Sequence, residues 1–248
     1  MTSTTTPRFS VVVPMKNEAD NIDLLIGEIE AACQGDDFEA IFIDDGSTDT
    51  TLARLQAAAK VKPWVRVVHH ASSGGQSAAV HSGVQAARAA IICTMDGDGQ
   101  NPPAEIPRLV APLLAANAAS TLGLVAGQRE KRQDTWSKKI ASKLANGIRQ
   151  RILKDNTRDT GCGLKAFRRD AFLDLPFFNH MHRYLPALFS AYGWQVAHVD
   201  VSHRHRHAGS SNYNNLQRGL VGIHDLIGVS WLIKRRKRVR PHNIGPSA

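Results

Sequence analysis

The first half of the chain alternates short apolar runs with longer stretches in which apolar residues recur every three or four positions. The runs at 9–13, 40–43, 64–68 and 89–94 have the length and composition of strands buried on both faces. A helical stripe follows the first run at 22–29, and similar stripes follow the others. This alternation predicts an α/β fold, with a mostly parallel sheet flanked by helices.

The second half continues the pattern less regularly. A short strand is expected at 122–127, a helix over 136–152 and a mostly apolar helix over 214–233. Residues 199–207 alternate in the manner of a strand, which would place three histidines on one face. Three histidines so arranged could ligate zinc, but an arginine-rich stretch more often faces phosphate or solvent. These histidines are His203, His205 and His207.

Charge and cysteine content narrow the class of protein. Lys and Arg number 31 against 22 Asp and Glu, a net charge of +9, which indicates a polyanionic partner such as a phosphate substrate, anionic lipid or nucleic acid. The three cysteines are far apart in the sequence and form no C-x-x-C pair, which suits a reducing cytoplasm and argues against a disulfide scaffold. Residues 1–8 lack a signal-peptide pattern and are expected to be a short disordered lead.

The strongest candidate for chemistry follows the fourth apolar run, at Asp96-Gly97-Asp98-Gly99-Gln100. In an open α/β sheet, ligands bind beyond the carboxyl ends of the strands. The glycines let the backbone approach a ligand, and two carboxylates with an amide oxygen are donors that Mg²⁺ or Mn²⁺ accepts. The segment predicts a seat for a metal-bound diphosphate, with Asp96, Asp98 and Gln100 as metal ligands. An ordinary acidic turn is the alternative, since Asp and Gly are common turn residues.

Polar residues also follow the first two strands. Asn17 and Glu18 come after the first strand, where they could cap the next helix or contact a ligand. Asp44 and Asp45 come directly after the second, which places their carboxylates beside the same edge as Asp96. A carboxylate there can accept hydrogen bonds from a base ring N–H or from ribose hydroxyls.

Four segments, in this order and spacing, resemble family 2 glycosyltransferases, and more narrowly the polyprenyl- and dolichyl-phosphate sugar transferases. They are Val11–Pro14 with Asn17-Glu18, Ile43–Asp49, Gly75–Ala79 and Met95–Pro103. The resemblance implies a GT-A fold, which is Rossmann-like, a nucleoside diphosphate sugar donor and a divalent metal, Mg²⁺ or Mn²⁺. The donor-binding positions that it implies are Pro14, Asn17, Glu18, Ile43, Asp45, Asp96, Gly97, Asp98, Arg129 and Arg206.

The resemblance also assigns roles in the second half. Arg129 matches an arginine that faces the donor phosphates, and Asp159 matches a segment that borders the sugar pocket. Lys138 and Ser142, one helical turn apart, would receive the acceptor's phosphate, although a solvated basic face explains them equally well. The implied catalytic residues are Asp98, Arg129, Lys138, Asp159 and Arg206.

One position departs from the family. After the arginine that matches Arg206, the family has a lysine that also grips the donor diphosphate, and here that position is Asn212. Either phosphate binding is weaker at this point, or a neighbour such as Arg204 or Arg218 compensates.

The acceptor is inferred from a missing pair of acids. In family 2, attack by a sugar hydroxyl often uses a base from a Glu-Asp pair near a segment like 182–186, and no such pair occurs between Asp174 and Asp200. A phosphate monoester is already an anionic nucleophile. We therefore expect transfer of a sugar from a nucleoside diphosphate to a polyprenyl phosphate, and the resemblance implies that the transfer is inverting. The alternatives are a glycosyltransferase acting on a sugar hydroxyl in surface polysaccharide synthesis, and a non-catalytic basic membrane- or nucleic-acid-binding protein.

The end of the chain predicts contact with a membrane surface. The apolar helix is too short to cross a bilayer, and Lys234-Arg235-Arg236-Lys237-Arg238 follows it. Such a segment fits anionic lipid at the inner face of the membrane, whereas a core helix with a solvated tail is the plain alternative. The basic cluster lacks the interleaved aromatics of nucleic-acid sites. The expected organisation is a lead at 1–8, a GT-A domain at 9–212 and a membrane-surface segment at 213–248, with homo-oligomers left open.

Overall fold

The computed structural model describes residues 6–129, 147, 149–153, 155, 157–204, 215–237 and 239, with only the backbone given for 215–221. The chain divides into two compact units, Met1–Asn212 and Tyr213–Ala248. Each unit is described by itself. The three expected roles of 1–8, 9–212 and 213–248 stay predictions.

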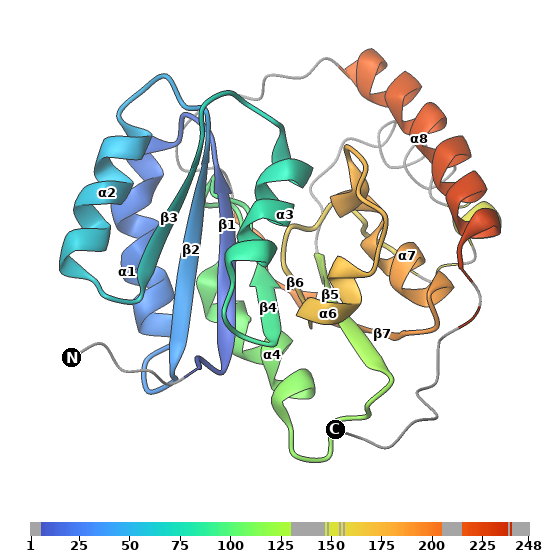
Figure 1. Cartoon of the computed structure of the whole chain (residues 1–248), viewed down its shortest axis with the longest axis horizontal. Coiled ribbons are helices and arrows are strands. Elements are labelled where there is room, and N and C mark those ends of the chain that lie inside the picture. The colour runs from blue at the N-terminus through green and yellow to red at the C-terminus, as the bar shows by residue number, and fades with distance from the viewer. Residues whose placement is uncertain are drawn as a thin grey trace, which may run out of the picture. The chain divides into compact units, whose positions relative to one another are not determined.

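Within the described part of the first unit, seven strands form one sheet in the order β3-β2-β1-β4-β6-β5-β7 (Figure 1). Its central strands are buried on both faces, as continuous apolar runs require. The strands are β1 (Phe9–Met15), β2 (Phe38–Asp45), β3 (Val65–His70), β4 (Ile91–Thr94), β5 (Leu122–Arg129), β6 (Lys165–Arg168) and β7 (Gln195–Val201).

Most strand pairs are parallel, which confirms the expected sheet. Only β6, among the described strands, runs antiparallel to its neighbours β4 and β5. The chain builds outward from β1 to β3 and then returns to place β4 on the other side of β1. Strand order therefore reverses between β1 and β4, and ligands bind α/β sheets at such a switch point.

Helices cover both faces of the sheet. One face packs against α1, α2 and α4, and the other packs against α3, α6 and α7; Figure 1 shows α3 in front of the sheet and α4 behind it. Stacked aromatic rings, such as those of Phe167 and Phe172 at 4.9 Å, fill the second face. The helices are α1 (Ile22–Ala32), α2 (Thr51–Val61), α3 (Gln76–Ala86), α4 (Ile106–Leu114), α6 (Arg169–Leu173) and α7 (Leu185–Ala191), with short 3₁₀ turns η1 (Ala19–Asn21), η2 (Pro103–Glu105) and η3 (Met181–Arg183).

The strand expected at 199–207 is wrong in its bounds, because β7 ends at Val201. Ser202 leaves the sheet, since both its N–H and its hydroxyl donate to Glu105 Oε1, at 3.1 and 2.7 Å. His203 is therefore not on a strand face, and His205 and His207 lie outside the described residues.

Two other expectations can be compared with the described residues. The helix expected over 136–152 falls mostly outside the described residues, although 147 and 149–153 are helical. The three cysteines, Cys33, Cys93 and Cys162, are buried and unpaired, as their spacing suggested.

The second unit contains one described helix, α8 (Asn215–Arg235), close to the expected span of 214–233. None of the helices in the described ranges is long and apolar enough to cross a membrane.

Candidate active site

The paired aspartates lie directly beyond β4, at the switch point of the sheet. Asp96 and Asp98 are both half-buried, and the Gln100 N–H donates to Asp98 Oδ1 at 3.1 Å. Gly97 packs so closely under the end of β1 that a Cβ there would lie 2.8 Å from the Pro14 carbonyl oxygen. Gly97 is thus required by the protein's own packing, whereas the sequence had suggested close approach to a ligand.

Asp96 is held by two amide groups. Gln76 Nε2 donates to its Oδ1 at 2.7 Å, and Asn101 Nδ2 donates to its Oδ2 at 3.0 Å. Burial and the neighbouring charge of Asp98 raise the pKa of the Asp96 carboxyl, while the Lys165 cation and the Asn101 amide oppose this. Lys165 is buried, donates to the Cys162 carbonyl and has a lowered pKa because of its desolvation.

These residues fit a divalent cation. The Asp96 and Asp98 carboxylates repel each other, and a cation bound between their oxygens would offset that repulsion. Mg²⁺ is usually held by one or two carboxylates together with substrate phosphates. No cluster of three or more His, Cys, Asp or Glu side chains suited to a metal occurs among the described residues. Among the described residues, Asp96 and Asp98 are the pair of carboxylates beyond β4 that could contribute oxygen ligands.

Hydrogen bonds join the loop that follows β1 to the loop that follows β2. The Asn17 N–H donates to Ser47 Oγ at 2.9 Å, and the Thr48 N–H donates to Asn17 Oδ1 at 2.8 Å. The Glu18 N–H donates to Thr51 Oγ1 at 3.0 Å in the same junction. Asn17 has a φ of 54°, in the left-handed region that asparagine tolerates. Asn17 joins the two loops through these bonds.

Two other positions implied for the nucleoside, Ile43 and Asp45, are both buried. Ile43 is fully buried, so only its main chain could meet a nucleoside. Asp45 is 4% exposed and each of its oxygens accepts two hydrogen bonds. These come from His70 Nδ1, Ser73 Oγ, and the N–H groups of Gly74 and Gly75, at 2.7 to 2.9 Å. They hold the pKa of the Asp45 carboxyl below its usual value despite its desolvation.

Arg129 and Asp159, expected to meet different parts of the substrates, form a bidentate ion pair. Arg129 Nε donates to Asp159 Oδ2 at 2.6 Å, and Nη2 donates to Oδ1 at 2.8 Å. The Asp159 contact raises the pKa of the Arg129 guanidinium, which also senses the charge of Asp96. The pair therefore belongs to the same electrostatic cluster as the aspartates beyond β4.

Arg204 holds the loop that follows Asp98 through contacts that no sequence pattern indicates. Its guanidinium binds Glu28 of α1 through two contacts of 2.7 and 2.6 Å and donates to the Gly99 carbonyl. Its N–H donates to the Gln100 carbonyl at 3.1 Å. Arg204 thus holds the loop from Gly99 to Gln100, and its expected compensation for the lysine that is missing at Asn212 stays a prediction. His203, next to it, has a buried Nδ1 with no hydrogen-bond partner among the described residues.

Four of the expected residues lie outside the described part of the chain. They are Lys138, Ser142, Arg206 and Asn212. Arg218, the second residue considered in place of the missing lysine, is described only in its backbone.

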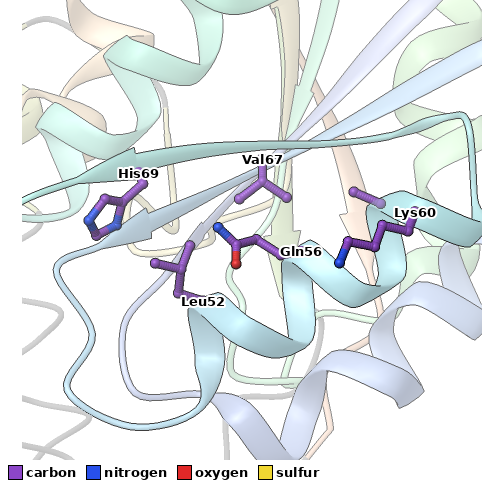
Figure 2. A pocket seen from close by; sticks show the side chains of 6 residues that line it. Leu52, Gln56, Lys60, Val67 and His69 are labelled. Carbon is purple, nitrogen blue, oxygen red and sulfur yellow. The ribbon is translucent and has the colours of Figure 1, made fainter.

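A groove of about 570 Å³ runs between α2 and β3 at the edge of the sheet. Figure 2 shows Leu52, Gln56 and Lys60 on the helix side and Val67 and His69 on the strand side. None of the residues expected to bind the donor or acceptor lines this groove.

Comparison with known protein families identifies the family of this chain. A model of the family described as Glycosyl transferase family 2 matches residues 10–175, which include every strand from β1 to β6. The chain belongs to glycosyl transferase family 2.

The relatives of this family 2 chain include lipid-phosphate enzymes. It is 33% identical over 222 residues to an undecaprenyl-phosphate 4-deoxy-4-formamido-L-arabinose transferase of Edwardsiella ictaluri, covering 88% of this chain and 66% of the relative. It is 35% identical over 217 residues to the enzyme of that name from Aeromonas hydrophila, covering 86% of this chain and 65% of the relative. The chain thus spans just under two thirds of the length of these curated relatives.

Solved structures share the fold. Glucosyl-3-phosphoglycerate synthase from Mycobacterium tuberculosis, in complex with UDP, aligns with a TM-score of 0.66 and 23% identity over 91% of this chain and 80% of that protein. The mannosyltransferase PcManGT from Pyrobaculum calidifontis, in complex with GDP-Man and Mn²⁺, aligns with a TM-score of 0.64 and 18% identity over 96% of this chain and 67% of that protein. At these identities the likeness is one of fold, and the expected GT-A fold is confirmed.

Gly163 provides a test of how tightly the family 2 site is packed. A Cβ at this position would lie 2.5 Å from Asp96 Oδ1, closer than van der Waals contact permits. We expect Gly163→Ala to lower the free energy of unfolding by about 1–3 kcal/mol, as overpacking does. Chemical denaturation measures this, with Gly27→Ala as the control.

Gly27 lies within α1 with open space around it, so its replacement by alanine should raise the free energy of unfolding by about 0.5–1 kcal/mol. Equal effects of the two substitutions would contradict the packing argument.

Proposed function

We propose that this family 2 protein transfers a sugar from a nucleoside diphosphate sugar to a polyprenyl phosphate, with inversion at the anomeric carbon. One observation carries the proposal: the two aspartates and the Arg129–Asp159 pair share one electrostatic cluster at the switch point of the sheet. A diphosphate needs cationic and metal-bound contacts there, and a transferred sugar needs polar groups beside them. The named activity of the relatives from Edwardsiella ictaluri and Aeromonas hydrophila supports the choice of acceptor.

Asp96 and Asp98, with the amide oxygen of Gln100, would hold the divalent cation, Mg²⁺ or Mn²⁺. When bound, such a cation stabilises the charge that develops on the leaving diphosphate. Arg129 donates from Nε and from Nη2 to Asp159, and no further hydrogen bond of its guanidinium is made within the described residues, so its other N–H groups would bind donor phosphates. Lys138 and Ser142 would bind the acceptor's phosphate, and Arg206 the donor diphosphate. The missing Glu-Asp pair between Asp174 and Asp200 is consistent with an acceptor that needs no general base.

The reaction is tested directly by a panel of nucleotide sugars with Mn²⁺ and a short polyprenyl phosphate. Incorporation of sugar into the organic phase from one donor is the expected result. If sugar passes only to soluble hydroxyl acceptors, the lipid-phosphate acceptor is wrong and polysaccharide synthesis replaces it. If no donor is consumed, and the protein binds anionic vesicles or nucleic acid with a steep salt dependence, the proposed enzyme activity is wrong and a non-catalytic binding protein replaces it.

We further propose that α8 contacts the cytoplasmic surface of an anionic membrane. Ile223, Ile227 and Trp231 are spaced by four residues, so they share one face of the helix, and they are 59%, 66% and 59% exposed. Basic residues follow directly, with Lys234 and Arg235 in the last turn. An exposed apolar face beside cations complements a surface of apolar tails and anionic headgroups.

Vesicle binding tests this surface. We expect Ile227→Glu to weaken binding to phosphatidylglycerol vesicles at least about tenfold, because one buried Ile side chain contributes about 1.5–3 kcal/mol. Co-sedimentation measures it, and Val61→Glu is the matched control, since Val61 is 76% exposed but lies at the end of α2 in the first unit. Equal binding by both variants would exclude the α8 face.

A further inference from the structure

The start of α3 touches the metal-ligand aspartate. Gln76, the first residue of this helix, reaches across to donate from Nε2 to Asp96 Oδ1 at 2.7 Å. The Gln76 side chain is exposed, so it is not needed to fill the core. Among the described residues, the Gln76 side chain donates a hydrogen bond to Asp96 alone, which indicates a role in orienting that carboxylate.

The turn that leads into Gln76 is fixed from the opposite side by Asp45. Ser73 Oγ and the Gly75 N–H donate to Asp45 Oδ2, at 2.7 and 2.9 Å, and the Gly74 N–H donates to Oδ1 at 2.8 Å. Gly75 has a φ of 85°, a conformation that turns the chain into the helix and that other residues rarely adopt. The position of Gln76 therefore depends on the contacts of Asp45.

The residue after Gln76 is anchored as well. Ser77 Oγ lies 2.7 Å from His182 Nδ1, and the His182 N–H also donates to that oxygen, at 3.4 Å. Desolvation lowers the pKa of the His182 imidazole to about 3, so the ring is neutral at physiological pH. Gln76 thus stands between two fixed points, Asp45 through the turn and His182 through the helix.

We propose that the turn Ser73–Gln76 couples the nucleoside end of the donor site to its cation end. In this arrangement Gln76 is a positioning residue that orients Asp96 for the cation. The proposal rests on the proposed function, because it treats Asp96 as a metal ligand and places the nucleoside at the end of β2, where Asp45 holds the turn through its four hydrogen bonds.

The physical basis is the geometry of a carboxylate. Its two oxygens offer about four lone-pair positions, and the amides of Gln76 and Asn101 take one on each oxygen of Asp96. The carboxylate plane is thereby fixed while the remaining lone pairs stay available. Groups that orient metal ligands in this way typically change metal affinity or activity by 10–100-fold when they are removed.

Direct measurement of Mn²⁺ binding tests the role of Gln76 without turnover. The free Mn²⁺ signal in electron paramagnetic resonance gives the dissociation constant of the whole protein in the absence of nucleotide. We expect Gln76→Met, which keeps the length but removes the donor, and Gln76→Ala to weaken binding about tenfold or more. Gln85→Ala, an exposed glutamine of the same helix, should leave it unchanged. Unchanged or tighter binding by both Gln76 variants would overturn the proposal.

The coupling itself is tested by a double-variant cycle. The Ser73 hydroxyl contacts Asp45 and not Asp96, yet Ser73→Ala should weaken Mn²⁺ binding by about threefold, because part of the loss of a hydrogen bond to a carboxylate would be transmitted through the turn. In the Gln76→Met background the same substitution should have no further effect. An additive effect would mean that Ser73 acts only on local stability, and the coupling would be wrong.

Failure of this inference differs from failure of the proposed function. If the wild-type protein binds no Mn²⁺ and transfers no sugar, the proposed metal-dependent reaction is wrong, and the proposed coupling is wrong as well. If the wild type binds Mn²⁺ and the Gln76 variants bind it equally well, only the coupling is wrong.

Discussion

Replacement of Asp98 by asparagine is expected to lower sugar transfer by about 10²–10³-fold. Asparagine keeps the size of the side chain and can still accept the Gln100 N–H through its own Oδ1. It removes one of the two negative charges that would hold the cation, whose stabilisation of the leaving diphosphate is worth several kcal/mol. Each 1.36 kcal/mol of that stabilisation is a factor of ten in rate.

The fold of this variant should be intact or slightly more stable. Asp98 raises the pKa of the Asp96 carboxyl through repulsion, so its neutralisation removes an unfavourable contact. Thermal unfolding checks this, and Asp174→Asn, an exposed aspartate at the end of α6, is the control for both activity and stability. If Asp98→Asn keeps more than about a tenth of wild-type transfer, the carboxylate is not a required metal ligand.

The strands of the first half could be predicted because their sequence pattern is local. Residues 40–43 form a continuous apolar run and residues 9–13 are apolar except for Ser10, which is the local pattern of a strand buried on both faces. β6 could not be predicted in this way, since it is a four-residue strand with cations at both ends, Lys165 and Arg168. Lys165 is buried by its contacts with distant parts of the site, which the sequence does not display.

The sequence predicted which strand ends contribute to the site, but not which side chains contact one another there. Asp45 ends β2 and Asp96 follows β4, two parallel strands on either side of β1, so both lie at the same edge of the sheet, as the sheet rule required. Their hydrogen-bond donors come from residues far along the chain, such as Gln76, which is 20 residues from Asp96. Arg204 reaches Glu28 across 176 residues. Such partners depend on the completed fold, and no local pattern identifies them.

Substitution of Asp159 by asparagine is expected to lower the free energy of unfolding by about 3 kcal/mol, because loss of one partner leaves a buried charge uncompensated. The side chains of Arg129 and Asp159 are 15% and 10% exposed, and the asparagine amide would present N–H groups to the guanidinium. Denaturant unfolding measures the loss. The double variant Arg129→Gln with Asp159→Asn should cost less than the sum of the two single variants, by about 1–3 kcal/mol.

Activity of the double variant separates a structural pair from a catalytic one. If the pair only joins the end of β5 to the segment around Gly161, whose N–H also donates to Asp159 Oδ1 at 3.2 Å, transfer should recover together with stability. We expect stability to recover while transfer stays at least about tenfold below wild type, because the N–H groups of Arg129 that would bind donor phosphates are lost. Full recovery of transfer would remove Arg129 from the catalytic residues and leave Asp96 and Asp98 as the charged core of the site.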